Sequence, residues 1–215
     1  MNITENFMFV NREEAGHILS SSLEEYKGMN GVVVAIPPGG VPIGYIIAKD
    51  LHFKLDLAFS KKIEHPLYGE YAIGAVSLTD CFIEDHAEVP KEYIQKEELR
   101  IRNKLKEMYT AYVDENKTPE VLKDKIVIIT DDGMATGRTI LNVIRMVKKH
   151  YPLKIIIAVP VSSQSALVKI KRHVDEIICP LVPELFVGVS RFYKDFKQLD
   201  DDEVKQYLEK HKNQE

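Results

Sequence analysis

The sequence predicts an α/β fold in which helices cover both faces of a doubly wound parallel sheet. Short, unbroken apolar runs alternate along the chain with longer segments whose apolar residues recur at helical spacing. Unbroken apolar runs are typical of parallel strands that are buried on both faces. Strands that alternate with helices in this way predict one parallel sheet. The 215 residues correspond to a single domain, which we place at residues 1–215.

The first third of the chain predicts a helix, a buried strand, a second helix and a second strand. In the first helix, at residues 11–26, Asn11 can cap the first turn and apolar residues recur on one face. The run GVVVAI at residues 31–36 predicts a buried strand. A loop rich in Pro and Gly separates it from a helix at residues 42–51, and residues 54–60 then alternate as a strand does.

The middle of the chain predicts a further strand and a long charged helix. Residues 71–77 carry the strand pattern, and residues 90–115 carry an apolar stripe among many charged side chains. We treat residues 90–118 as a helical insertion whose stripe docks on the core. Acidic residues interleave with the basic ones, so we do not expect this helix to bind nucleic acid. The stripe consists of Tyr93, Ile94, Leu99, Ile101, Leu105, Met108, Tyr109 and Tyr112.

The strand–loop–helix at residues 126–147 points to a ligand. Its apolar strand ends in Asp131 and Asp132, and small or hydroxyl-bearing residues dominate the loop at residues 133–139. Open α/β sheets bind ligands at this position, where free N–H groups at a helix N-terminus favour an anion. Carboxylates beside an anion site suit sugar hydroxyls or a divalent cation. The stretch therefore predicts a sugar phosphate, bound by its phosphate at one end and by its vicinal hydroxyls at the other.

The last third of the chain repeats the alternation of strands and helices. Strands at residues 154–161 and 174–179 flank a helix at residues 164–171. Ser162 or Ser163 can cap this helix. The pattern then becomes irregular and aromatic, before a surface helix that we expect at residues 200–210.

Composition and charge limit the partners that we expect. Hydrophobic residues make up 45% of the chain and charged residues 29%, which is typical of a globular protein with a full core. The formal net charge of −4 predicts no general attraction to nucleic acid or to a membrane. The chain starts without a basic leader, and no apolar run approaches the ~20 residues that span a bilayer. Cys81 and Cys179 form no metal-type cluster, so we expect reduced thiols in the cytoplasm.

Residues 127–139, VIITDDGMATGRT, resemble the 5-phosphoribosyl pyrophosphate (PRPP) fingerprint of type I phosphoribosyltransferases. That fingerprint consists of four apolar residues, two acidic residues and a loop that ends in Thr-Gly and a small or hydroxyl residue. Thr130 departs from it, because it takes the fourth apolar place. The resemblance extends over approximately residues 11–204. The chain is most similar to a bacterial and archaeal group of uncharacterised phosphoribosyltransferases whose acceptor is not settled.

The resemblance implies a Mg²⁺-dependent pentosyl transfer of nucleotide metabolism. The phosphoribosyl group of PRPP would pass to an unidentified acceptor, a nitrogenous base, with release of pyrophosphate. Asp131 and Asp132 would then bind the ribose hydroxyls and Mg²⁺, and we count both among the catalytic residues. The 5-phosphate would be bound by Ala135, Thr136, Gly137, Arg138 and Thr139.

The family also places a pyrophosphate-binding loop after the first core strand, often with a strained or cis peptide. Pro38, Gly39 and Gly40 occupy that place. A basic residue often follows the next strand and faces the pyrophosphate. Lys61 or Lys62 would take this role, with Lys61 as the catalytic choice, and the sequence does not decide between them.

Two further parts of the family fold have counterparts here. Residues 180–199 correspond to a small hood over the acceptor, and residues 64–70 correspond to a loop that closes over the substrate. Aromatic faces can stack on a flat heterocycle, so we assign the acceptor to the hood residues Phe186, Phe192 and Tyr193, although such rings can equally seal the end of a sheet. The chain is expected to form a homodimer.

Two other functions remain open from the sequence. One is a regulator that keeps the PRPP site but senses nucleotides, and the other is a hydrolase or phosphorylase-like enzyme acting on a phosphoribosyl compound. Ala135 narrows the list of possible acceptors, because members of the hypoxanthine–guanine branch of the family usually carry an acidic residue at that position. Adenine- and uracil-type members also carry alanine, so we expect hypoxanthine and guanine to be poor acceptors.

Overall fold

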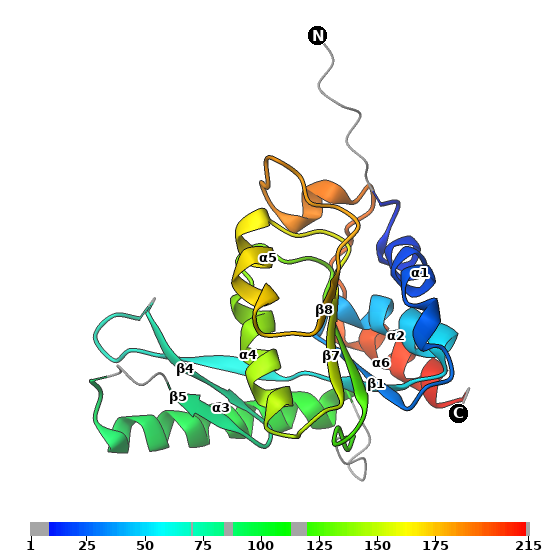
Figure 1. Cartoon of the computed structure of the whole chain (residues 1–215). Coiled ribbons are helices and arrows are strands. Elements are labelled where there is room, and N and C mark those ends of the chain that lie inside the picture. Colours follow the sequence, from blue (N-terminus) through cyan, green and yellow to red (C-terminus); the bar gives the residue numbers. More distant parts are fainter. Residues whose placement is uncertain (1–8, 70, 84–87, 113–119, 214–215) are drawn as a thin grey trace.

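The computed structural model describes residues 9–69, 71–83, 88–112 and 120–213. Its centre is a five-stranded sheet with strand order β2-β1-β6-β7-β8, in which all neighbouring strands are parallel (Figure 1). The predicted α/β fold with a doubly wound parallel sheet is confirmed. The strands are β1 (Gly31–Ala35), β2 (Lys54–Leu57), β6 (Ile126–Thr130), β7 (Lys154–Ala158) and β8 (Glu176–Ile178).

Helices cover both faces of this sheet. Successive strand residues point to opposite faces, so Ile128 belongs to one core cluster while Val127 and Ile129 belong to the other. Helices α1 (Arg12–Ser22) and α2 (Gly40–Leu51) pack on the first face, to which Ile128 points. The second face is covered by α4 (Arg138–Lys148) and α5 (Gln164–Lys171). Burial on both faces explains the unbroken apolar runs in the sequence.

The predicted helix caps are present. The Asn11 side chain accepts a hydrogen bond from the Glu14 N–H at the start of α1, which ends before a short 3₁₀ turn, η1 (Glu24–Tyr26). At α5 the cap is Ser163, whose hydroxyl oxygen accepts from the Ala166 N–H. No helix within the described ranges is long and apolar enough to cross a membrane.

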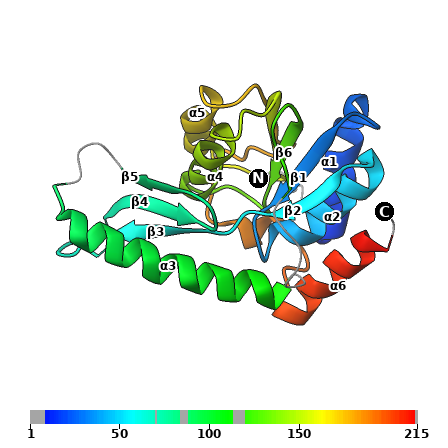
Figure 2. The same ribbon diagram turned by 90° about the horizontal axis from the view of Figure 1, so that it is seen from below.

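A second, antiparallel sheet extends from the parallel sheet as an arm and was missed by the sequence prediction. It consists of β3 (Ser60–Glu64), β4 (Ala72–Ser77) and β5 (Cys81–Ile83), in the order β3-β4-β5. Residues 54–60 are therefore not one strand, because β2 ends at Leu57 and β3 begins three residues later. Both views show the arm reaching away from the parallel sheet (Figures 1 and 2).

The charged helix α3 (Lys91–Tyr112) lies along this arm (Figure 2). The predicted stripe is confirmed at Ile101, Leu105 and Tyr109, which are buried, but Leu99 is 62% exposed and does not belong to it. The remainder of the predicted insertion, residues 113–118, lies outside the described residues.

The C-terminal segment covers one end of the sheet. Residues 180–199 are irregular apart from a 3₁₀ turn, η2 (Val189–Phe192), and hydrogen bonds between Phe9 and the backbone of Phe192 and Lys194 tie them to the start of α1. The final helix, α6 (Asp201–Lys212), is not purely a surface helix, because Val204 is fully buried.

Candidate anion-binding site

Two loops meet at the carboxyl edge of the parallel sheet. One joins β1 to α2 and the other joins β6 to α4, and they lie side by side because β1 and β6 are neighbouring strands. The Ile36 N–H donates to the Thr130 carbonyl at 2.9 Å where the loops begin. A Cβ on Gly39 would lie 2.2 Å from Asp132 Oδ2, and a Cβ on Gly40 would lie 2.6 Å from the Thr130 carbonyl oxygen. Only glycine therefore lets the two loops approach this closely.

The loop after β6 is anchored by hydrogen bonds of Met134 and Ala135. Buried Met134 donates its N–H to the Val161 carbonyl at 2.8 Å and accepts from the Ser163 N–H at 2.9 Å. The Ser163 hydroxyl donates to the Ala135 carbonyl at 2.6 Å. The segment between β7 and α5 thus holds this loop in place.

The N–H groups of the same loop remain open to a ligand. Within the described part of the chain, those of residues 135–137 and of Thr139 have no protein acceptor. Gly137 precedes α4 with φ of 69°, a left-handed conformation that glycine adopts readily. The Lys169 ammonium donates to the Thr136 carbonyl at 2.6 Å and brings a positive charge that the sequence prediction had not included. Open donors at a helix N-terminus, next to a cation, favour a phosphate.

The five predicted phosphate-binding residues share this loop. Their side chains are exposed, except that Gly137 is buried, and the Arg138 N–H lies 3.5 Å from the Thr136 hydroxyl. Thr130, the departure from the fingerprint, is fully buried, and its hydroxyl has no hydrogen-bond partner among the described residues. The five residues are Ala135, Thr136, Gly137, Arg138 and Thr139.

The two aspartates have different surroundings. Asp131 Oδ1 accepts a hydrogen bond from the Asp132 N–H at 2.8 Å. Asp132 Oδ2 accepts two hydrogen bonds from Arg12, from Nε at 3.0 Å and from Nη2 at 2.8 Å. Desolvation raises the pKa of Asp131 well above its ordinary value, and the adjacent Asp132 carboxylate raises it further. Desolvation also raises the pKa of Asp132, but the Arg12 guanidinium opposes that rise.

Arg12 is a site residue that sequence reasoning missed. It follows the cap of α1, where an arginine is usually solvated, and nothing in the local pattern marks it as buried. In the structure it is only 9% exposed. Only the three-dimensional placement of α1 beside the end of β6 brings it to Asp132.

The pyrophosphate loop differs from the prediction in one respect. The Pro37–Pro38 peptide is cis, as the family resemblance implied. The Gly40 N–H is not open to a ligand, because it donates to the Ile36 carbonyl at 2.8 Å. The Gly39 N–H has no acceptor in the residues that the structure describes, so Gly39 keeps an open donor, whereas Gly40 permits the close packing of the two loops.

The two lysines lie in a strand and not directly after one. Lys61 and Lys62 belong to β3 of the arm, which begins three residues after the end of β2. Lys62 pairs with Glu64 at 2.8 Å. Desolvation lowers the pKa of Lys61, and the nearby ammonium of Lys104 on α3 lowers it further. A contact of Lys61 or Lys62 with pyrophosphate stays a prediction.

The hood rings also differ from the prediction. Phe192 and Tyr193 are 5% and 3% exposed, so they are core residues and do not offer free faces for stacking. Tyr193 instead donates its hydroxyl to the Asp132 carbonyl at 2.7 Å. Phe186 is half-buried, with its ring centroid 5.5 Å from that of Phe192, and it is the ring of the three that keeps an accessible surface.

The predicted closing loop forms the tip of the β3–β4 hairpin. The His65 N–H donates to the Tyr71 carbonyl at 2.8 Å, and the exposed side chains of Leu67 and Tyr68 lie at the tip. Glu70 lies outside the described residues. Closure of this loop over the substrate stays a prediction.

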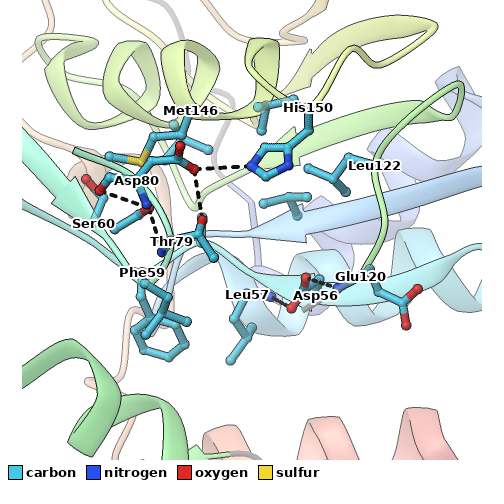
Figure 3. Close-up of a pocket in the computed structure, with 16 residues that line it drawn as sticks. Asp56, Leu57, Phe59, Ser60, Thr79, Asp80, Glu120, Leu122, Met146 and His150 are labelled. Carbon is cyan, nitrogen blue, oxygen red and sulfur yellow. Dashed lines mark hydrogen bonds and ion pairs between the residues drawn. The ribbon is translucent and has the colours of Figure 1, made fainter. Parts of the chain in front are cut away.

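A cavity of about 100 Å³ lies elsewhere, where the arm joins the parallel sheet. It is bounded by the end of β2, by the β4–β5 turn and by the C-terminal half of α4 (Figure 3). In that turn Asp80 accepts from the Thr79 hydroxyl at 2.8 Å and lies 3.2 Å from His150 Nε2. Because the phosphate loop precedes the other end of α4, this cavity is not part of the anion site.

The protein alone offers few metal ligands. No group of three or more His, Cys, Asp or Glu side chains able to hold a metal ion occurs in the described ranges. Asp131 and Asp132 supply oxygen ligands of the kind that Mg²⁺ prefers, but a complete coordination shell would need oxygens from the substrate and from water.

Comparison with known proteins agrees with this geometry. The family model for the phosphoribosyl transferase domain matches residues 10–197. The chain belongs to this phosphoribosyl transferase family. Two Mycobacterium tuberculosis proteins, from strains CDC 1551 and H37Rv, are provisionally named phosphoribosyl transferases. Each is 29% identical over 211 residues, which cover 94% of this chain and 47% of the relative. The chain therefore spans about half the length of these relatives.

Solved structures share the fold of this chain. The crystal structure of TT1426 from Thermus thermophilus has a TM-score of 0.85 and 28% identity, with 94% of this chain and 97% of that chain covered. A hypothetical protein from Neisseria gonorrhoeae, solved with bound ppGpp, has a TM-score of 0.53 and 13% identity, with coverage of 98% and 99%. At that identity the second likeness shows the fold alone.

We predict that Gly39→Ala weakens binding of Mg²⁺–pyrophosphate by about tenfold or more. The new Cβ would lie 2.2 Å from Asp132 Oδ2, so either the carboxylate or the loop must move. Calorimetry measures the affinity. An affinity of Gly39→Ala equal to that of the natural protein would remove the β1–α2 loop from the site.

We predict that Asp131→Asn melts at a higher temperature than the natural protein at pH 7. A carboxyl whose folded pKa is raised favours the folded state below its ordinary pKa, and that contribution is lost as pH rises through the folded value. Asparagine carries no charge to desolvate, so the gain should shrink as the pH falls towards about 4. Thermal melts between pH 3.5 and 8 check this. Exposed Asp195→Asn is the control, and a lower melting temperature for Asp131→Asn at pH 7 would contradict the account.

Proposed function

We propose that the protein is a Mg²⁺-dependent phosphoribosyltransferase that transfers the 5-phosphoribosyl group of PRPP to a nitrogenous base and releases pyrophosphate. The observation that carries the proposal is the contact of two strand-end loops, with Gly39 packed against Asp132. A ligand at this edge meets a phosphate loop, two carboxylates and a second loop with an open N–H group within one site. PRPP requires that combination, because it carries a phosphate, a ribose diol and a diphosphate.

The loop at residues 135–139 would bind the 5-phosphate. Open N–H groups, the Thr136 and Thr139 hydroxyls and the N-terminus of α4 all favour a bound anion. Arg138 and Lys169 add positive charge around the same loop. A protein with a net charge of −4 needs such local donors, since it gives no general attraction to a phosphate.

The reacting end of PRPP would lie between the aspartates and Gly39. The carboxylates of Asp131 and Asp132 would accept hydrogen bonds from the ribose hydroxyls and hold Mg²⁺, directly or through water. Bound Mg²⁺ would neutralise charge on the departing pyrophosphate. The Gly39 N–H would donate to the same group, so these residues act mainly by positioning and by stabilising developing charge.

On the acceptor side we propose a base other than hypoxanthine or guanine. Ala135 offers no carboxylate to the ring of a 6-oxopurine, and general acid–base help is typically worth about 10²–10⁴-fold in rate. Half-buried Phe186 is the hood ring with surface left for stacking on a flat base. We further propose a homodimer, and a cytoplasmic location that suits the free thiols of Cys81 and Cys179.

The test is pyrophosphate release from Mg²⁺–PRPP with hypoxanthine, guanine, adenine, uracil or orotate. We predict turnover with a base outside the hypoxanthine–guanine pair, and loss of at least about 100-fold in the double variant Asp131→Asn/Asp132→Asn, as expected when contacts to developing charge are removed. Release from PRPP without any base would instead indicate a hydrolase. Binding of PRPP without turnover on any base would favour the regulator, and efficient turnover of guanine would refute the role given to Ala135.

A further inference from the structure

Helix α5 contacts the phosphate loop with one of its faces. A Cβ on Gly137 would lie 3.4 Å from Ala166 Cβ and 3.4 Å from Ile170 Cγ2, and both of these side chains are fully buried. Ser163 precedes Ala166 by three positions and Lys169 follows it by three. Residues at this spacing lie on the same side of a helix, so all four face the loop.

Three successive carbonyl groups of the loop accept hydrogen bonds from this face. The Met134 carbonyl accepts from the Ser163 N–H at 2.9 Å. The Ala135 carbonyl accepts from the Ser163 hydroxyl at 2.6 Å, and the Thr136 carbonyl accepts from the Lys169 ammonium at 2.6 Å. The segment that caps and forms α5 therefore binds three carbonyls in a row.

Binding of these carbonyls fixes the direction of the N–H groups that follow them. In a planar trans peptide, the carbonyl and the N–H of the next residue point in opposite directions. The peptides of this loop are not cis, so each carbonyl held against α5 directs the next N–H away from α5. These N–H groups belong to Ala135, Thr136 and Gly137, which have no protein acceptor for them within the described ranges. Successive N–H groups directed to one side form a concave site for an anion.

We propose that Ser163 and Lys169 are positioning residues for the phosphate end of the donor, because they bind the loop carbonyls and thereby direct the N–H groups toward the 5-phosphate. This inference rests on the proposed function and adds to it the residues that set the geometry of the loop. The Lys169 ammonium binds a carbonyl, so it lies across the peptide from the N–H that faces the ligand. Neither side chain touches the phosphate.

Each of the two side chains controls a different N–H group. The Ser163 hydroxyl binds the Ala135 carbonyl and so directs the N–H of Thr136. Lys169 binds the Thr136 carbonyl and so directs the N–H of Gly137. The effects of replacing the two side chains can therefore be told apart at the level of single peptide groups.

The replacement of Ser163 must keep the start of α5 intact. The same hydroxyl oxygen accepts from the Ala166 N–H at 3.1 Å as the helix cap. Glycine is the substitute that costs a helix cap least among residues without a hydroxyl or a carboxylate, so Ser163→Gly removes the donor with little loss of helix stability. Lys169 is exposed, so Lys169→Met keeps the test available even if Ser163→Gly fails to fold.

Calorimetric titration with ribose 5-phosphate measures the contribution of each side chain. We expect Lys169→Met and Ser163→Gly each to weaken binding by about tenfold, since each misdirects one hydrogen bond to a charged group. Lys169→Arg keeps a charged donor and should bind within about threefold of the natural protein. Lys171→Met removes an exposed lysine of the same helix and is the matched control for charge. Binding of Mg²⁺–pyrophosphate, which we assign to the other loop, should be unchanged in all four variants.

Amide proton shifts at saturating ribose 5-phosphate test whether the two side chains act by direction. A charge-assisted hydrogen bond to phosphate moves an amide proton downfield. In the natural protein the amide protons of Ala135, Thr136 and Gly137 should all move downfield. Lys169→Met should reduce this shift selectively at Gly137, and Ser163→Gly should reduce it selectively at Thr136. A lysine that acted only through its charge would reduce all three shifts together.

The outcomes separate this inference from the function on which it rests. If the natural protein binds ribose 5-phosphate and Lys169→Met binds it equally well, the positioning role is refuted and the proposed function stands. An equal reduction of the three amide shifts, or a loss of affinity in Lys171→Met as large as that in Lys169→Met, would also refute it. Failure of the natural protein to bind either ribose 5-phosphate or Mg²⁺–PRPP would refute both the function and this inference.

Discussion

The close contact between the β1–α2 loop and the end of β6 is the constraint on which the rest of the site depends. Neighbouring parallel strands bring two loops to the same edge, but side chains usually keep such loops apart. Here Gly39 and Gly40 remove the side chains at the contact, and Asp132 and the Thr130 carbonyl fill the space. One edge of the sheet thereby carries an anion loop, two acids and a further N–H donor.

The hood and the arm, the two parts added to the parallel sheet, differ in how they are connected to this edge. The hood is connected to it by Arg12 and by Tyr193, so the hood and this edge of the sheet share a set of hydrogen bonds. The arm instead leaves the sheet after β2, and its buried residues, such as Ile63 and Ile73, belong to the core cluster on the first face of the sheet. The cavity at its base lies beside the far half of α4, which separates it from the phosphate loop.

Local patterns in the sequence predicted the features that depend on neighbouring residues. Strand β6, its two acids and the loop before α4 follow from an apolar run, a turn and helical spacing, and the cap of α5 follows from a serine at its start. Contacts between residues that lie far apart in the sequence could not be predicted from such local patterns. Arg12 lies 120 positions before Asp132, and the burial of Tyr193 depends on packing against Phe9. The alternation in residues 54–60 likewise did not reveal the break between β2 and β3, where the second sheet begins.

The most direct test of a single composite site is a crystal structure of the protein with Mg²⁺ and PRPP. The account predicts that the 5-phosphate oxygens lie within hydrogen-bond distance of the N–H groups of residues 135–139, with the ribose hydroxyls at Asp131 and Asp132 and the diphosphate beside the Gly39 N–H. PRPP that contacts only one of the two loops, or that binds in the cavity at the base of the arm, would contradict it.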